Sequence, residues 1–78
     1  MPWTKRTHIK RKIAQAFFSL DKSMKLFLVL KRVFEEHHPQ EAEELENAAA
    51  MLLLVQTFLV EFARKHYALE PESYESYL

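Results

Sequence analysis

Residues 35–44 read EEHHPQEAEE, and this stretch decides the fold because it places Pro39 between two strongly apolar segments. Proline disfavours helical geometry at the residue before it and has no N–H to donate inside a helix, but it suits the first turn of a new helix. The glutamates after Pro39 complement the positive end of a helix dipole, and His37 and His38 complement the negative end of a preceding helix. The sequence therefore predicts a first helical arm over residues 4–36 and a second helix that begins at Pro39.

The second helix is predicted to reach residue 67 or 68 and to stop before Pro71. At 100° per residue its polar side chains occupy only about 100° of the helical wheel, and its apolar side chains spread over about 220°. That arc is too wide for a helix that rests against a single neighbour. We therefore expect this helix to need contacts on two sides.

The first arm is predicted to be an amphipathic helix whose apolar stripe changes direction. Up to Met24 the apolar residues lie on one side, whereas from Leu26 onward they centre roughly 90° further round, and Lys31 falls on the earlier stripe. A straight helix would then have to bury two sides. Two alternatives follow: a bend or break near residues 19–23, or a continuous helix held between two partners.

The composition favours a single all-α domain over residues 1–78. The chain has no glycine, where average usage of about 7% would give about five, so turns that need a positive φ lack their usual residue. This argues against β-hairpins and sheets. Hydrophobic residues make up 49% of the chain, which is far too much for a disordered protein. We expect a helical hairpin, with residues 70–78 forming either one more helical turn or a loose tail.

Charge is separated along the chain. Residues 1–34 carry nine Lys and Arg against one Asp, and residues 35–78 carry ten Glu against two basic residues, which gives formal charges of +8 and −8. Halves of opposite charge attract when the chain folds back on itself or pairs head to tail with a copy. The total is zero, so the net charge by itself indicates no partner.

The predicted apolar surface exceeds what two helices of this length can bury against each other. Chains below about 80 residues rarely gain more than ~3–5 kcal/mol from their own core, and soluble monomers rarely expose contiguous apolar patches beyond a few hundred Å². We therefore predict a small non-enzymatic binding protein (an accessory subunit, adaptor or regulator) that completes a helical bundle with a partner protein or with copies of itself as a homo-oligomer. Gln56 is expected to fix the register between chains. The predicted interface consists of Phe27, Leu30, Phe34, Met51, Leu52, Val55, Phe58, Leu59 and Phe62.

The basic N-terminal segment supports a different class of function. It combines fixed positive charges, which grip phosphates, with one aromatic side chain that can stack on a base. The alternative hypothesis is a nucleic-acid-binding protein, although the same charges also suit a solvated surface or a contact with the acidic half. Its predicted contacts are Trp3, Lys5, Arg6, Lys10, Arg11 and Lys12.

Motifs for chemistry are incomplete. Glu35-x-x-His38 matches one element of carboxylate-bridged di-iron bundles, but the second such pair is missing. Arg32 with His37 or His38 has a spacing similar to that of helical ribonucleases of the HEPN type, a similarity that covers two residues. We predict no enzyme, no cofactor and no metal site. His66 is expected to be a hydrogen-bonded core residue.

Few features of the sequence bear on location. The absence of cysteine fits a reducing compartment. The apolar run over residues 48–60 is shorter than the ~20 residues of a spanning helix, so we expect a cytoplasmic protein with no membrane span. The first twenty residues are basic and free of acids, a composition shared with mitochondrial presequences, which leaves targeting to an organelle open.

Overall fold

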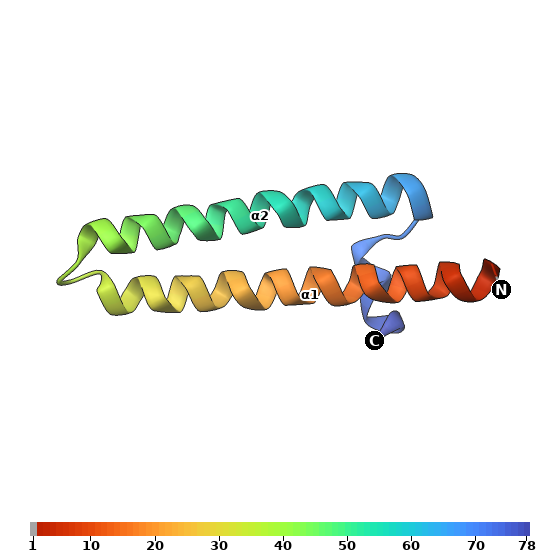
Figure 1. Ribbon diagram of the computed structural model, residues 1–78, viewed down its shortest axis with the longest axis horizontal. Helices are drawn as coiled ribbons and strands as arrows, with labels where there is room; N and C mark the ends of the chain where they lie inside the picture. Colours follow the sequence, from red (N-terminus) through yellow and green to blue (C-terminus); the bar gives the residue numbers. More distant parts are fainter. Residues whose placement is uncertain (1) are drawn as a thin grey trace.

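The computed structural model describes the backbone of residues 2–78 and the side chains from Arg6 onward. It contains two long antiparallel helices, α1 (Pro2–Phe34) and α2 (Pro39–Tyr67), followed by a short 3₁₀-helix, η1 (Pro71–Tyr77) (Figure 1). No strand occurs in this part of the chain. The predicted all-α helical hairpin is therefore confirmed.

The turn between the helices is built around Pro39. α1 ends at Phe34, and the His38 N–H donates to the Phe34 carbonyl at 2.7 Å. Pro39 and Glu41 lie in the first turn of α2, where the carboxylate complements the helix dipole. The Phe34 and His38 rings pack edge to face with centroids 5.8 Å apart, which holds the two helix ends together.

α1 is one continuous helix, so the break considered near residues 19–23 does not form. Serine, aspartate and lysine there do not interrupt a helix, and the stretch lacks the proline or glycine that usually kinks one. Lys31 keeps its place on the side that faces α2, because its ammonium group reaches Glu46 of α2 at 3.1 Å. The residues of this side are all buried or half-buried: Lys10, Ile13, Phe17, Leu20, Met24, Phe27, Lys31 and Phe34.

α2 packs on α1 mainly through small residues. Its buried residues are Ala42, Ala49, Gln56 and Ala63, and a spacing of seven keeps one side of a helix toward its neighbour. The Gln56 Nε2–H donates to the Phe17 carbonyl of α1 at 3.3 Å. The expectation that Gln56 acts between chains is therefore wrong, because it lies in the contact between the two helices of one hairpin.

The C-terminal residues form the helical turn η1, which packs on α1 at the open end of the hairpin. The chain leaves α2 at Ala68, which has a φ of +50°. The Tyr74 side chain is buried, and its ring meets Phe17 edge to face at 4.9 Å. The small hydrophobic core at this end comprises Ile13, Ala14, Ala63, Leu69 and Tyr74.

The molecule is a rod of 54 × 20 × 19 Å, with the turn at one end and the start of α1 at the other (Figure 1). This shape gives each helix a long outer side that the other helix does not cover.

Candidate protein-binding face

Large apolar side chains are exposed on the outer sides of both helices. In α1 all of them except Ile9 lie in the half nearest the turn, and in α2 they lie in the middle and toward the open end. We call the following nine residues the apolar face: Leu26, Val29, Leu30, Val33, Met51, Leu54, Val55, Phe58 and Phe62.

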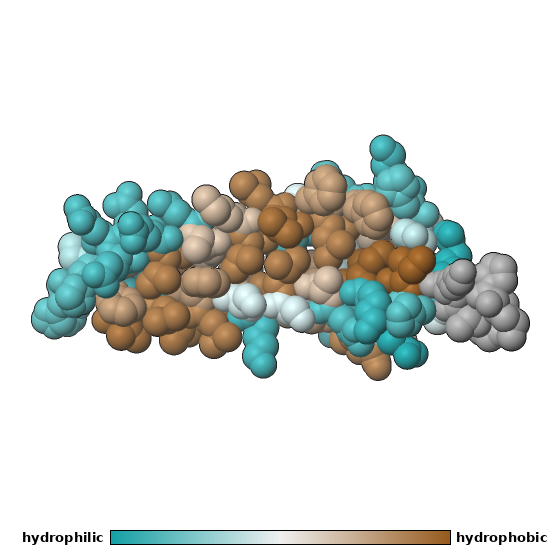
Figure 2. Space-filling view, in the orientation of Figure 1, coloured by the Kyte–Doolittle hydropathy of each residue, from teal (hydrophilic) through white to brown (hydrophobic). Residues whose placement is uncertain are grey.

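Both groups point to the same broad side of the hairpin. At 100° per residue, each group is centred about 120° from the residues that face the other helix, in the same rotational sense. Because the helices run in opposite directions, this rotation brings the two groups to one side. Figure 2 shows the result as a hydrophobic band that runs from α1 beside the turn to the C-terminal half of α2. In the same orientation, α1 passes in front of η1, so the band lies on the side away from η1 (Figure 1).

The exposure of these side chains is large. Leu54 is 71% exposed, Phe58 70% and Val33 69%, whereas the buried positions of α2 are three alanines and a glutamine. The hairpin thus uses its small residues for internal packing and leaves bulky ones outside. Burying one such bulky side chain is worth about 1.5–3 kcal/mol, so the apolar face is a strong potential binding surface.

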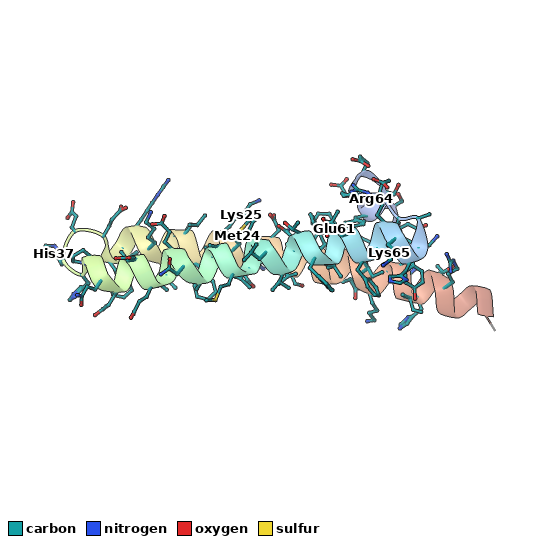
Figure 3. All side chains as sticks on the ribbon, turned by 90° about the horizontal axis from the view of Figure 1, so that it is seen from above. Met24, Lys25, His37, Glu61, Arg64 and Lys65 are labelled. Carbon is teal, nitrogen blue, oxygen red and sulfur yellow. The ribbon has the colours of Figure 1, made fainter. Side chains whose placement is uncertain are left out.

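Charged residues flank the apolar face at both ends of α2. Glu41 and Glu44 precede Met51 on the same side of the helix, and Lys65 follows Phe62 on that side. The labelled side chains mark these two ends, with His37 at the turn and Lys65 at the open end (Figure 3). A partner on this face therefore meets carboxylates at one end and an ammonium group at the other.

A shallow hollow of about 210 Å³ lies at the open end of the face, lined by Phe58, Glu61, Phe62, Lys65 and His66. The Phe62 and His66 rings lie 4.8 Å apart. The prediction of a core role for His66 is wrong, because the His66 side chain is exposed.

The residues predicted for the protein interface divide into two groups. Leu30, Met51, Val55, Phe58 and Phe62 belong to the apolar face. The others are half-buried, as part of the hairpin itself: Phe27, Phe34, Leu52 and Leu59.

Sequence reasoning missed Leu26, Val29, Val33 and Leu54. Their spacing of three or four residues within each helix was the available signal, but the wide apolar arc did not show which part of it would face the other helix.

The basic segment contacts the C-terminal part of the chain. The Arg6 guanidinium lies 4.9 Å from the centroid of the Tyr67 ring, and the Lys10 ammonium lies 5.8 Å from that of Tyr77. The Arg11 Nε–H donates to the Tyr77 carbonyl at 3.2 Å, and Lys12 is exposed. The side chains of the other two predicted nucleic-acid contacts, Trp3 and Lys5, lie outside the described residues.

The residues of the two chemical motifs lie around the turn. Arg32, Glu35, His37 and His38 are all exposed there, and a hollow of about 390 Å³ is lined by residues 37–41. His38 Nδ1 lies 3.8 Å from a Glu41 carboxylate oxygen. In the searched part of the chain, no three His, Cys, Asp or Glu side chains are grouped to hold a metal ion.

No protein-family model, curated protein or solved structure gives a significant match to this chain. By length and composition, α2 is apolar enough to cross a membrane, and only 11% of its most apolar window is buried. This window includes charged and polar residues beyond the uncharged run seen in the sequence. The physical choice is therefore between a protein partner and a lipid environment for the outer side of α2.

Proposed function

We propose that this protein is a small non-enzymatic binding protein, an accessory subunit, adaptor or regulator, whose apolar face docks on another protein surface. The observation that carries the proposal is the exposure of nine large apolar side chains on one side of the hairpin. Such a contiguous face on a soluble protein indicates an interaction site.

The total surface area supports this proposal. A folded monomer of 9.3 kDa is expected to expose about 5000 Å², whereas the chain exposes 6035 Å². The excess of about 1000 Å² is comparable to the ~800 Å² that each partner buries in a standard protein–protein interface.

The packing of α2 favours a protein partner over a bilayer. α1 lies along α2 and carries Asp21, Lys22 and Lys25 close to the Gln56–Phe17 contact. A charged side chain at the centre of a bilayer costs about 2.5–3.5 kcal/mol or more. This cost disfavours entry of the intact hairpin into a membrane, and an inserted α2 would lose its contacts with α1.

Site-specific photo-crosslinking in cells that express the full chain tests the proposal. A photoreactive phenylalanine derivative replaces Phe58 on the apolar face or, as the matched control, Leu53. Leu53 is also an exposed apolar residue of α2, at 50%, but it lies about 140° away on the wheel. We expect discrete protein adducts from position 58 and few or none from position 53.

Two results would contradict the proposal. Equal adduct yields from both positions would show that the apolar face has no preferred partner. Adducts of position 58 with lipid and not with protein would show that α2 lies in a membrane.

A further inference from the structure

We propose that the occupant of the apolar face is a second copy of this chain, lying antiparallel to the first so that the turn end of each hairpin covers the open end of the other. This inference rests on the proposed function and names its partner. The result is a dimer with a four-helix bundle, in which α1 lies on α1 and α2 on α2.

The distribution of charge selects the antiparallel arrangement. Residues 31–46, at the turn end, carry six glutamates against Lys31 and Arg32. At the open end, six basic residues outnumber the four glutamates of residues 61–75, and these basic residues are Arg6, Lys10, Arg11, Lys12, Arg64 and Lys65. Within one hairpin these groups remain at opposite ends of a 54 Å rod. An antiparallel copy brings unlike ends together, and a parallel copy would bring like ends together.

The side chains on α2 then fit in pairs. We place the two-fold axis at the level of Leu53 along α2. In an isologous contact, residues at equal distances on either side of the axis lie opposite each other. Met51 therefore lies opposite Val55 of the second copy. The same axis places the large Phe58 opposite the small Ala48 of the second copy. Further out, Lys65 meets Glu41 of the second copy. Large residues meet small ones, and cations meet anions.

The hollow at the open end is also consistent with this register. Its lining includes Phe58, Phe62 and Lys65, with Glu61 and His66 completing it. The first turns of α2 from the second copy, with Glu41, Glu44 and Leu45, lie opposite this hollow in the proposed register. A carboxylate from that segment meets Lys65, and the apolar part of the segment covers Phe62.

α1 supports the same axis. The contacts Gln56–Phe17 and Lys31–Glu46 place the middle of α2 beside residues near 21 in α1. On the side of the apolar face, Ala16 of one copy then lies near Leu26 of the other, and Ile9 lies near Val33. Ile9 is 37% exposed in the hairpin and Val33 is 69% exposed.

The decisive experiment exchanges charge between positions 41 and 65 and follows mass in solution by sedimentation equilibrium at low salt. In the E41K variant both positions carry lysine, and in the K65E variant both carry glutamate, so each homodimer has like charges at two symmetry-related contacts. We expect each variant alone to dimerise at least about tenfold more weakly than the natural chain. An equimolar mixture restores both contacts, and the dimer should return to its natural strength.

Glu75→Lys is the control, because Glu75 is an exposed glutamate of η1, which lies on the side of the hairpin away from the apolar face. We expect E75K alone to dimerise like the natural chain. Its equimolar mixture with K65E should stay weaker than the natural chain, because the mixed dimer still has one contact between glutamates at positions 41 and 65. Circular dichroism of every variant shows that the helices persist. Failure of the E41K and K65E mixture to regain strength, or an equal loss in E75K, would overturn the antiparallel register.

The two proposals fail in different ways. The natural chain can be measured over a 100-fold range of concentration up to its solubility limit. If it stays monomeric over that range, yet position 58 crosslinks to a different protein, the second-copy inference is wrong and the proposed function stands. If position 58 crosslinks to no protein at all, both are wrong. Adducts with the mass of two chains support both.

Discussion

Ala68 holds a backbone conformation that its side chain disfavours. Its φ of +50° and ψ of +36° lie in the left-handed region, where the Cβ of an L-residue crowds the backbone. The conformation persists because it lets the chain leave α2, with the Leu69 N–H donating to the Ala63 carbonyl at 3.2 Å and the Leu69 side chain buried. A chain without glycine has placed alanine where glycine is usual.

We expect Ala68→Gly to stabilise the protein by about 0.5–1 kcal/mol, because it removes this strain. Ala50 is exposed in the middle of α2, so Ala50→Gly should instead destabilise it by about 1 kcal/mol. Urea unfolding followed by circular dichroism measures both changes. A loss of stability in A68G as large as that in A50G would contradict this account.

The Tyr74 hydroxyl is buried and has no hydrogen-bond partner among the described residues. Burial raises the pKa of Tyr74 above its ordinary value of 10.0, with Glu70 and Glu72 adding to the rise and Arg64 opposing it. In the unfolded chain this proton leaves near pH 10, whereas the folded chain keeps it to higher pH. The free energy of unfolding therefore falls as the pH rises past 10, and the contribution is intact below that pH.

Tyr74→Phe should leave stability at pH 7 unchanged or raise it by up to about 1 kcal/mol, because a buried unpartnered hydroxyl carries a desolvation penalty. The variant should also lack this part of the alkaline loss. Unfolding midpoints of the two proteins between pH 7 and pH 11 test both points. The gap between them should widen above pH 10, and a gap that narrows there would refute the assignment.

Among the elements, α2 is defined by the seven-residue spacing of its buried positions. Small side chains there allow close approach to α1, and closely packed contacts tolerate added volume poorly. Two neighbouring alanines of α2 lie in different environments. Ala49 is 4% exposed and packs in the contact between the helices, whereas Ala50 faces solvent.

Ala49→Leu should destabilise the hairpin by about 1–3 kcal/mol through overpacking, whereas Ala50→Leu should change stability by less than about 0.5 kcal/mol. Thermal unfolding of the two variants in the same buffer provides the comparison. Equal effects would mean that the contact between α1 and α2 is looser than described.

The elements show what the sequence could predict and what it could not. Pro39 was enough to predict two helices and their order, because its effect is local. The continuity of α1 was not predictable, because Lys31 looks misplaced in the stripe until Glu46 of α2 supplies its partner, which also raises the pKa of Lys31. The burial of Tyr74 could not be predicted either, because η1 is too short to show a periodic pattern.

For the apolar face, the sequence predicted a surplus but not its position. The wide arc of α2 contains both Leu52, which is half-buried, and Leu54, which is mostly exposed. Which of them faces α1 is settled by the spacing of the small residues across the contact. That spacing has meaning only once the neighbouring helix is in place.

At the scale of the whole molecule, the hairpin brings its two charged halves together only in part, because the acidic turn end stays apart from the basic N-terminal segment. The glutamates of residues 41–46 follow the turn directly, so their neighbours on α1 come from the part of that helix nearest the turn. Lys31 meets Glu46 there, but the basic residues near the N-terminus lie at the far end of the rod. The charges sum to zero over the whole sequence, but the folded molecule keeps an excess of glutamates at its turn end.

The position of η1 has a consequence for how many chains can join. A hairpin with apolar surfaces on both flanks would associate without limit and form filaments, because each added molecule would present another apolar flank. Here the C-terminal segment caps one flank at the open end, and the Asp21–Lys25 pair, 2.9 Å apart, keeps the middle of α1 hydrophilic. In the proposed dimer, the flank beside η1 exposes fewer large apolar side chains than the apolar face, so we expect association to stop at two chains.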